Sequence, residues 1–397
     1  MSTTVTAGPL PPAQRVLAPD LGRGLLLLAI ALANAALHRY GPVYGIRLHP
    51  LGGTPLDHAV EAVLVTFVDG RAYPLFAALF AYGTVQLSRR CTGGAKQLVR
   101  RRARWLLVLG SVHAVALFSG DVLGTYALLS LVLLALAGAR DRTLLWLGGL
   151  WLLPTAVITA LVYGIRPAEP GRRQYLWSMA IADPLEALAW RPLEWLMTLP
   201  AMAGVGSAAL AGVWAARRRI LESPADHRPL LRRVAAIGIG LATAGGIPTA
   251  AAVIGRWRPG DGTLLVVSGL HGVTGVAGGL GYLALIGLLA ARAQTPAGPV
   301  AAGARTPPAG LGVWRARVIR ALVATGRRSL SMYLAQSVVF AGLFTAWAGG
   351  LGDDLGAAAV AGTAVLTWAA TVAAAVLLER RGMRGPAEVL LRRLTYR

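Results

Sequence analysis

The sequence predicts an all-α polytopic membrane protein with about ten transmembrane helices. Of its 397 residues, 55% are hydrophobic and only 14% are charged, whereas roughly a quarter of the residues are charged in an ordinary soluble domain. The mean hydropathy is +0.58. The apolar residues gather in runs close to the ~20 residues that a helix needs to cross a bilayer. A soluble domain and a disordered chain are excluded, and the single cysteine, Cys91, excludes an intrachain disulfide.

Ten apolar runs mark the predicted crossings. They are 18–37, 71–88, 103–119, 122–139, 143–163, 195–215, 234–254, 263–291, 328–347 and 355–378. A further run, 59–68, is too short to cross a bilayer, so we expect a re-entrant or interfacial piece that leads into the second crossing. Trp177 and Trp190 lie in the long outer loop 164–194, which favours an interfacial helix on the outer leaflet.

The basic residues predict the orientation of these crossings. With the N-terminus inside, the inner segments hold 30 of the 39 Lys and Arg residues and the outer segments hold 9. Cytoplasmic loops of membrane proteins carry such an excess, so we expect both termini in the cytoplasm. The net charge of +22 therefore lies in short loops between apolar runs. This distribution predicts contact with a lipid bilayer and no nucleic-acid partner.

Composition divides the chain into four parts. Residues 1–17 begin with an uncharged, Pro-containing stretch and are expected to form a disordered tail. Residues 18–292 hold eight predicted crossings and form the membrane body. The Ala/Gly/Pro-rich stretch 293–312 predicts a flexible cytoplasmic linker. Residues 313–397 form a two-helix C-terminal part with a basic tail.

Ionisable residues inside a predicted span are costly, so each is a functional candidate. His113 lies roughly 9 Å from the outer end of the third crossing, and Asp121 follows at the turn into the fourth. A carboxylate beside an imidazole fixes the tautomer of the ring and raises its basicity, as in a general base. The alternative is a histidine satisfied by a neighbouring carbonyl and an aspartate that caps the fourth helix.

Further candidates lie on the first two crossings. Asp20 and Arg23 are three residues apart at the inner end of the first crossing. They can form a structural ion pair, or Arg23 can face an anionic ligand from the cytoplasm. Asn34 lies further out on the same helix and can line the same cavity. Arg71 points into an outer vestibule or extends to the outer lipid headgroups.

The ninth crossing carries a polar stripe. Ser329, Tyr333, Gln336 and Ser337 recur at spacings of three to four and therefore share one helix face. Small and polar residues also join helices to one another, but a Tyr and a Gln exceed what packing needs and favour a function. His271 is a second intramembrane histidine without an acidic neighbour in sequence. The sequence has no HExxH, Walker or GxSxG motif, and we expect neither ATP coupling nor a metal.

Five stretches in chain order, from residue 20 to 396, carry a family resemblance. They are Asp20-Leu-Gly-Arg23-Gly24-Leu with Asn34; Asp69-Gly-Arg-Ala-Tyr73-Pro-Leu-Phe76 with Leu79-Phe80-Ala-Tyr82-Gly83; Arg100-Arg-Arg with Leu109-Gly110, His113 and Gly120-Asp121-Val-Leu, followed by Tyr126-Ala-Leu; Gly326-Arg327 with Ser329-Leu-Ser-Met-Tyr333 and Gln336-Ser337; and Arg384-Gly385-Pro386-Ala-Glu388 with Leu391-Arg392-Arg393-Leu-Thr-Tyr396. Together they resemble the YeiB-like bacterial membrane family, domain of unknown function 418. Ala81 stands where this family usually has Gly, and Gly22 stands where a bulkier residue is usual.

That family is similar to a wider group of transmembrane acyltransferases, of the acyltransferase-3 and heparan-glucosaminide acetyltransferase types. The group transfers an acyl group from cytoplasmic acyl-CoA to an acceptor, often a sugar, and uses a membrane-embedded histidine. The resemblance implies that His113 is the general base and that Asp121 orients it. For the phosphates of CoA it suggests Arg23, Arg100, Arg101 and Arg327. The expected substrate-binding residues are Asp20, Asn34, Arg71, Tyr126, His271, Ser329, Tyr333 and Gln336.

The resulting hypothesis is an acyltransferase of the bacterial cytoplasmic (inner) membrane. Acyl-CoA, expected as acetyl-CoA, is the donor, and the acceptor is a hydroxyl or amine of a glycan, lipid or small molecule at or beyond the outer face. The sequence does not decide whether the protein forms a homo-oligomer. The alternative is a transporter or permease for a small metabolite, in which His113, Asp121 and His271 bind substrate or relay protons. The missing inverted repeat and missing broken-helix pairs count against transport, and the intramembrane polar residues count against an inert scaffold.

Overall fold

The computed structural model describes residues 16–40, 44–49, 51–89, 91, 94–166, 176–294 and 309–396. Within these ranges the chain is helical and has no β-strand, so the predicted all-α class is confirmed. The α-helices are α1 (Leu17–Leu37), α2 (Pro55–Phe67), α3 (Ala72–Arg89), α4 (Ala95–Ala116), α5 (Leu123–Ala135), α6 (Asp141–Leu150), α7 (Leu152–Tyr163), α8 (Pro184–Met202), α9 (Gly206–Arg217), α10 (Arg228–Val253), α11 (Asp261–Gln294), α12 (Ala309–Gly326), α13 (Ser329–Phe344), α14 (Leu351–Asp354), α15 (Ala357–Arg380) and α16 (Pro386–Tyr396). The 3-10 helices are η2 (Ile46–Leu48), η3 (Trp177–Ala180) and η4 (Ala203–Val205). Most of the predicted tail, 1–17, and of the predicted linker, 293–312, lies outside the described residues.

Six helical segments of the described chain are long and apolar enough to cross a membrane. They are Leu17–Leu37, Pro55–Arg89, Asp141–Tyr163, Arg228–Val253, Asp261–Gln294 and Ala357–Arg380. Two further predicted crossings form shorter apolar helices, α5 and α13. These helices support the predicted membrane protein, whereas the count of ten crossings and the cytoplasmic termini stay predictions.

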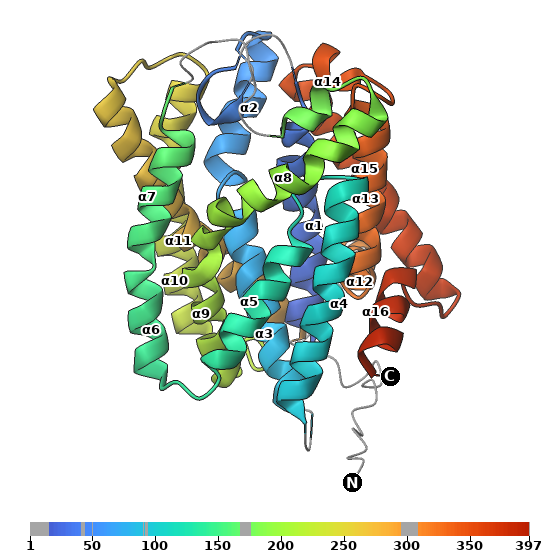
Figure 1. The fold of residues 1–397 in the computed structure, drawn as a ribbon. Helices are drawn as coiled ribbons and strands as arrows, with labels where there is room; N and C mark the ends of the chain where they lie inside the picture. Colours follow the sequence, from blue (N-terminus) through green and yellow to red (C-terminus); the bar gives the residue numbers. More distant parts are fainter. Residues whose placement is uncertain are drawn as a thin grey trace.

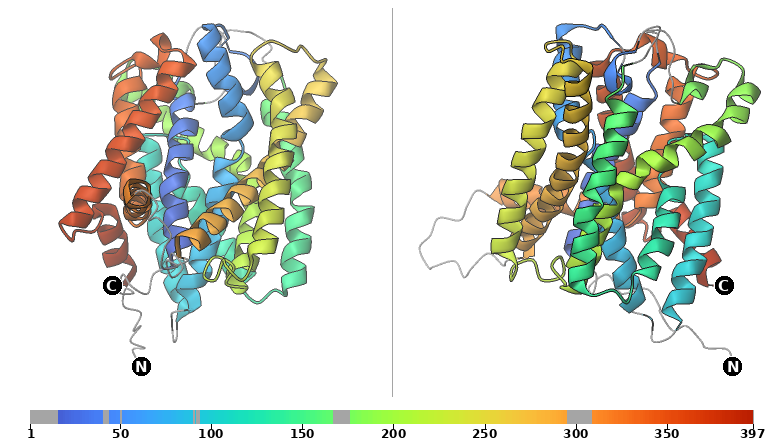
Figure 2. Two further views of the ribbon diagram at one scale, coloured as in Figure 1. Left: turned by 180° about the vertical axis from the view of Figure 1, so that it is seen from behind. Right: turned by 60° about the vertical axis from the view of Figure 1, so that its left-hand side comes forward.

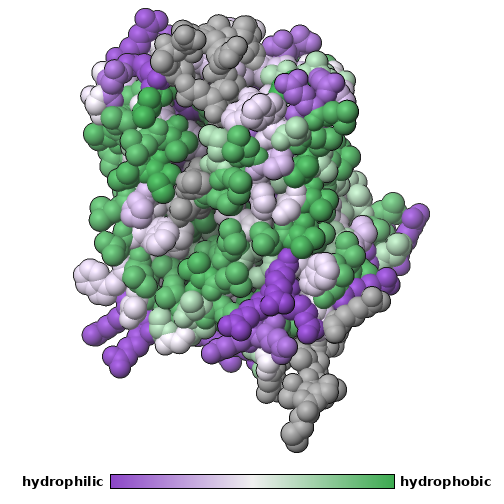
Figure 3. Space-filling model, in the orientation of Figure 1, coloured by the Kyte–Doolittle hydropathy of each residue, from purple (hydrophilic) through white to green (hydrophobic). Residues whose placement is uncertain are grey.

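The flank of the bundle is apolar. Trp146 is 80% exposed and Leu366 is 72% exposed. Figure 3 shows hydrophobic side chains over the middle of the bundle and hydrophilic ones gathered toward its two ends. Apolar surface of this extent is typical of a protein that faces lipid.

The first helix lies inside the bundle and joins the two halves of the chain. Helix α1 packs against α3 and α11 and also against α12, α13 and α15, and these helices surround it in Figure 2. A Cβ atom at Gly24 would lie 2.1 Å from the carbonyl oxygen of Leu322, and one at Gly326 would lie 1.8 Å from that of Asp20. Glycine therefore lets the backbones of α1 and α12 touch.

The two ends of the bundle differ in what they carry. Helix α1 begins and α16 ends at the same end (Figure 1), which is the arrangement that an even number of crossings gives. We call this end, which holds the predicted cytoplasmic arginines, the inner end. Helices α2 and α14 lie at the opposite, outer end (Figure 1).

The apolar run 59–68 lies in α2, a short helix that leads into α3, the second predicted crossing. Helix α2 begins with a capping box, in which Thr54 and Asp57 each accept a backbone N–H of the other. It packs against α10 and α15, and Pro55–Arg89 is one broken helix. In the break, Gly70 has φ +73°, a left-handed conformation that favours glycine. The position of α2 relative to the bilayer, re-entrant or interfacial, stays a prediction.

Replacing Gly326 by Ala is expected to destabilise the protein. The added Cβ would meet the Asp20 carbonyl oxygen at 1.8 Å, so α1 and α12 have to separate, at a cost of about 1–3 kcal/mol. Thermal unfolding of the purified protein in nanodiscs should show a lower midpoint. Gly342→Ala is the matched control, because a Cβ at this α13 position meets nothing within 4 Å. An equal midpoint for both variants would contradict the close contact.

Candidate functional site

The structure brings His113 and Asp121 together. His113 lies near the end of α4, and Asp121 lies just before α5. The imidazole Nδ1 is 2.8 Å from Asp121 Oδ1, and the two residues are 2% and 0% exposed. Asp121 Oδ2 also accepts the Gly124 N–H at 2.7 Å, so the aspartate both orients the histidine and caps α5. Within the described chain, His113 Nε2 is buried without a hydrogen-bond partner.

Glycines allow this close pairing. A Cβ atom at Gly110 would lie 2.3 Å from the Gly124 nitrogen and 2.7 Å from Asp121 Oδ2. One turn of α4 therefore rests directly on the first turn of α5. The short connection between them then places Asp121 beside His113, one turn beyond Gly110 on the same α4 face.

Helix α8 fixes the connection from the outer side. It runs obliquely across the bundle (Figure 1) and packs against α4. Arg191 Nη1 donates to the carbonyl oxygens of Val115 and Ala116, at 3.0 and 2.9 Å, where a helix C-terminus favours a cation. Three residues further on, the Glu194 carboxylate accepts the Ser119 hydroxyl at 2.5 Å.

Glu194 also anchors the segment before α8. It accepts the backbone N–H and the hydroxyl of Ser178, both at 2.6 Å. Arg191 and Glu194 are fully buried, so α8 is part of the packed bundle and not only a helix on the outer leaflet. Neither residue was a candidate from the sequence, because both lie in the predicted outer loop 164–194. The available signal was an Arg-x-x-Glu pair on one face of an apolar segment.

An inner cavity of about 270 Å³ leads toward this pair. We define the inner cavity by Arg23, Arg102 and Arg327 at one end and by Ile30, Val122 and Tyr333 at the other. Ile30 lies seven residues beyond Arg23 on α1, which is roughly 10 Å. The middle of the wall is apolar and includes Leu26, Leu27 and Phe76.

Tyr333 separates this cavity from His113. The two rings are 5.1 Å apart between centroids. Within the described chain, the Tyr333 hydroxyl is buried and has no hydrogen-bond partner. The end of the inner cavity therefore has Tyr333 at its wall, and the His113 ring, whose Nε2 has no hydrogen-bond partner among the described residues, packs against Tyr333.

The arginines of the inner cavity differ in how they are paired. Arg23 donates to Asp20 at 3.1 Å, as the structural interpretation of this pair predicts. Arg327 lies 3.5 Å from Asp20 and 2.9 Å from Glu379. Within the described residues, no carboxylate lies in ion-pair distance of Arg102, which stacks over the ring of Phe80 at 5.9 Å.

Arg102 was not singled out from the sequence, whereas Arg100 and Arg101 were. The structure leaves Arg100 exposed on α4, and Arg101 donates to the Thr395 carbonyl oxygen at 3.4 Å. Neither lines the inner cavity. The helical period explains the difference, because Arg102 is four residues from both Leu98 and Leu106, which are buried.

The predicted stripe on α13 divides between two environments. Ser329 and Tyr333 line the inner cavity. Gln336 donates to Thr371 Oγ1 at 3.3 Å, and Ser337 donates to the Tyr333 carbonyl oxygen at 3.2 Å. Gln336 therefore joins α13 to α15, and the Ser337 hydroxyl is satisfied within α13.

A polar layer lies beyond the inner cavity. Tyr73 Oη donates to Asn34 Oδ1 at 3.1 Å, and Tyr126 Oη donates to the Tyr73 carbonyl oxygen at 2.9 Å. Asn34 stands between Ile30, which lines the inner cavity, and Leu37, which lines a second pocket. This layer lies between the two spaces.

The second pocket is smaller and has a volume of about 90 Å³. We define the outer pocket by six of its wall residues: Arg47, Asp69, Tyr73, Thr159, Tyr163 and His271. Gly120, the neighbour of Asp121, lies in the same wall. The pair of His113 and Asp121 is thus close to both spaces.

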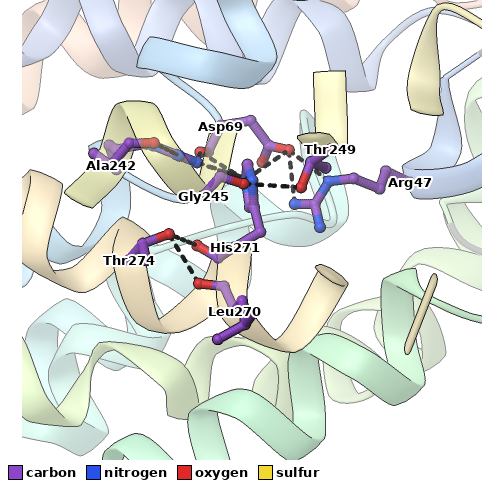
Figure 4. Close-up of polar contacts among 9 residues, drawn as sticks. Arg47, Asp69, Ala242, Gly245, Thr249, Leu270, His271 and Thr274 are labelled. Carbon is purple, nitrogen blue, oxygen red and sulfur yellow. Dashed lines mark hydrogen bonds and ion pairs between the residues drawn. The ribbon is translucent and has the colours of Figure 1, made fainter. Parts of the chain in front are cut away.

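Arg71 and His271 are joined next to the outer pocket. Arg71 Nη1 lies 2.5 Å from His271 Nε2 and donates to the Asp69 carbonyl oxygen at 2.5 Å. Arg71 Nη2 donates to the Ala242 carbonyl oxygen at 2.7 Å. Figure 4 shows His271 and Arg47 against Asp69. Arg71 is fully buried and neither lines the pocket nor extends to a lipid headgroup, which corrects both interpretations of it from the sequence.

No site for a metal ion built from three or more His, Cys, Asp or Glu residues occurs in the described part of the chain. Cys91, the single cysteine, lies apart from both spaces.

Helical architecture, apolar flanks and a buried His–Asp pair define an all-α membrane protein with a polar centre. The model of the family described as "Protein of unknown function (DUF418)" matches residues 215–303 and 310–397. This match confirms the resemblance predicted from the sequence. The chain is also similar to "Uncharacterized protein YxaH" of Bacillus subtilis (strain 168), at 28% identity over 263 residues. The match covers 57% of this chain and 64% of YxaH, less than two thirds of that relative. No solved structure matches the chain.

Removing the Glu194 carboxylate is expected to loosen the connection between His113 and Asp121. In Glu194→Ala, the buried hydroxyl groups of Ser119 and Ser178 lose their acceptor, at a cost of about 1–3 kcal/mol for each unsatisfied group. Thermal unfolding in nanodiscs should show a clear loss of stability. Glu186→Ala removes an exposed carboxylate of the same helix and should change little. Equal unfolding temperatures for the two variants would refute the anchoring role.

Proposed function

We propose that this protein is a transmembrane acyltransferase, which moves an acyl group from cytoplasmic acyl-CoA to an acceptor on the outer side. The observation that carries the proposal is the buried His113–Asp121 pair with an unengaged His113 Nε2. Asp121 accepts the Nδ1–H, which holds the ring in the tautomer whose Nε2 lone pair is free. That is the arrangement of a general base oriented by a carboxylate.

The reaction follows from this arrangement. His113 Nε2 removes the proton from the acceptor hydroxyl or amine, and the acceptor atom forms a bond to the thioester carbon. The carbon–sulfur bond breaks, and the CoA sulfur leaves with the proton that the imidazolium returns. The Tyr333 hydroxyl, which is buried without a partner among the described residues, donates a hydrogen bond to the oxyanion that develops on the thioester carbonyl.

The inner cavity suits the donor substrate. Arg23, Arg102 and Arg327 bind the phosphates of CoA, because guanidinium groups form charge-assisted hydrogen bonds with phosphate oxygens. The apolar wall at Leu26, Leu27 and Phe76 receives the pantetheine arm. The thioester then reaches Tyr333, beside His113. The bilayer, an exported glycan, lipid or small-molecule acceptor, and the location in the bacterial inner membrane belong to the same proposal.

A transporter for a small metabolite is the second candidate. It is favoured by the two separate spaces on either side of the polar layer of Asn34 and Tyr73, and by the broken helix Pro55–Arg89, since transporters bind substrates at such breaks. Acyl-CoA turnover distinguishes the two candidates. A transporter would move a solute into proteoliposomes without consuming acyl-CoA.

Arg102→Ala is expected to weaken acetyl-CoA binding about 10- to 100-fold, which corresponds to the ~1.5–3 kcal/mol of a hydrogen bond to a charged group. Isothermal calorimetry on the protein in nanodiscs measures this affinity. Arg101→Ala is the matched control, because Arg101 lies one position away on α4 and does not line the inner cavity. An identical loss in both variants would point to a general effect of charge. No binding of acetyl-CoA or longer acyl-CoA to the unmodified protein at millimolar concentration would exclude the proposed activity.

His113→Ala and Asp121→Asn should retain acetyl-CoA binding and lose transfer. Loss of a general base lowers a rate by about 10²- to 10⁴-fold, and Asn at position 121 favours the wrong tautomer of His113. The assay follows the appearance of labelled acetyl groups in glycan and lipid extracts supplied to proteoliposomes. His58→Ala serves as the control, because His58 lies outside both spaces. Undiminished transfer in His113→Ala would rule out this residue as the base.

A further inference from the structure

The outer pocket holds an arginine that is inserted from a loop. Arg47 lies in η2 and has φ 56°, and the next residue, Leu48, has φ 61°. Neither is glycine, and side chains rarely adopt this conformation. The strained turn directs the Arg47 side chain into the bundle, where it is only 2% exposed. Strain of this kind persists where the surroundings hold it and is common at ligand sites.

Arg47 is only partly engaged in the pocket. Its Nε and Nη2 donate to the same oxygen of Asp69, Oδ2, at 2.9 and 2.7 Å. The ring of Tyr163 lies 4.7 Å from the guanidinium carbon. Nη1 is buried and has no hydrogen-bond partner within the described chain. A buried donor without an acceptor is costly, so Arg47 has a free donor group at the wall of a pocket.

The charges around the pocket do not balance. Arg47 and Arg71 are two buried cations, and Asp69 is the carboxylate next to them. Arg71 is fixed by carbonyl oxygens and by His271, so it does not face the space itself. Glu61, the carboxylate of the neighbouring α2, pairs with Arg39 at 2.8 Å. Among the described residues, one positive charge is therefore not compensated, and a buried charge is stable only beside a charge of opposite sign.

We propose that the outer pocket binds the oxyanion of a small molecule, a carboxylate or a phosphate group, through Arg47 Nη1. The pocket volume of about 90 Å³ suits a headgroup and not a whole glycan. Oxygen atoms of Thr159 and Tyr163 in the wall offer hydrogen bonds to a hydroxyl group next to the oxyanion. The ligand reaches the pocket from the outer side, since the layer of Asn34 and Tyr73 lies between it and the inner cavity.

The oxyanion site indicates which kind of molecule accepts the acyl group in the proposed reaction. Gly120, which precedes Asp121, lies in the pocket wall, so an acceptor anchored at Arg47 extends its hydroxyl or amine toward His113. This step rests on the proposed acyl transfer, whereas binding of the oxyanion does not. An acidic acceptor, such as a hydroxy acid or a phosphorylated headgroup, is the expected class.

Binding of inorganic phosphate and of acetate tests the site. The protein is placed in phosphatidylcholine nanodiscs, and the affinity of each probe is measured by calorimetry. The unmodified protein should bind at least one probe saturably, and Arg47→Ala should weaken this binding at least tenfold. Arg166→Ala should leave it unchanged, because Arg166 is an exposed outer arginine that pairs with Asp261. Absence of saturable binding of both probes to the unmodified protein would overturn the proposal.

Two further variants keep the test informative if Arg47→Ala does not fold. Arg47→Lys retains the charge beside Asp69 but has no second donor arm, so it should fold and bind the probe about tenfold more weakly. Asp69→Asn removes the competing carboxylate and should tighten binding of the same probe. Equal affinity of the unmodified protein, Arg47→Lys and Asp69→Asn would refute the role of Arg47.

The source of the oxyanion is distinguished by the lipid. If nanodiscs that contain phosphatidylglycerol abolish binding of the soluble probe, the site takes a lipid phosphate. If they leave it unchanged, the site takes a soluble anion. Acetyl-CoA binding measured on the same samples separates the two proposals. Oxyanion binding without acetyl-CoA binding would exclude the acyltransferase and retain this site, and the reverse result would exclude this site alone.

Discussion

The hydrogen bond between His113 Nδ1 and the Asp121 carboxylate imposes conditions that several helices have to meet. Both groups are buried, and a buried carboxylate is tolerated only when it is hydrogen-bonded. The contact requires α4 and α5 to touch at Gly110 and Gly124. It also requires the connection between them to stay fixed, which α8 achieves through Glu194. Three helices are therefore arranged around one pair of side chains.

The bundle holds two separate spaces, the inner cavity and the outer pocket. Helices α1 and α3 each contribute to both, with Ile30 and Phe76 in the inner cavity and Leu37 and Tyr73 in the outer pocket. Between these positions, Asn34 and Tyr73 satisfy each other. A continuous opening would admit water and separate the polar groups, which strengthen one another at low local dielectric. The polar layer thus lies between the two spaces and satisfies the polar groups of α1 and α3 at the centre of the bundle.

The sequence was sufficient for the features that depend on local patterns. Apolar runs predicted helices at α1, α10, α11 and α15, because length and hydropathy act within one segment. The pairing of His113 with Asp121 and of Asp20 with Arg23 was one of two interpretations that the sequence allowed, since eight and three residues of chain separate the partners. Such short separations limit where the side chains can lie.

Features that depend on distant segments were not predictable in this way. Arg47 meets Asp69 and the ring of Tyr163 only because a loop, a helix break and α7 converge. Glu194 reaches Ser119 across 75 residues. Arg100 and Arg101 were chosen from the sequence in place of Arg102, because three consecutive arginines do not by themselves show which one faces the inside of the bundle. The number of arginines in a loop predicts on which side of the membrane that loop lies. The residues that each arginine contacts follow only from the packing of the helices.

Buried polar groups without partners are informative here only in combination with a space beside them. Arg191 also has a buried Nε and Nη2 without partners in the described chain, yet it lines neither the inner cavity nor the outer pocket. Its guanidinium lies 5.7 Å from the Trp347 ring, which provides a cation–π contact in place of further hydrogen bonds. Tyr333 Oη and Arg47 Nη1 are in a different position, since both residues border a space. The His113 ring packs against Tyr333. An unsatisfied group costs stability wherever it occurs, but it can gain a partner from a ligand only where a ligand can enter. Tyr333 and Arg47 meet this condition because they line the inner cavity and the outer pocket, whereas Arg191 lines neither of these two spaces.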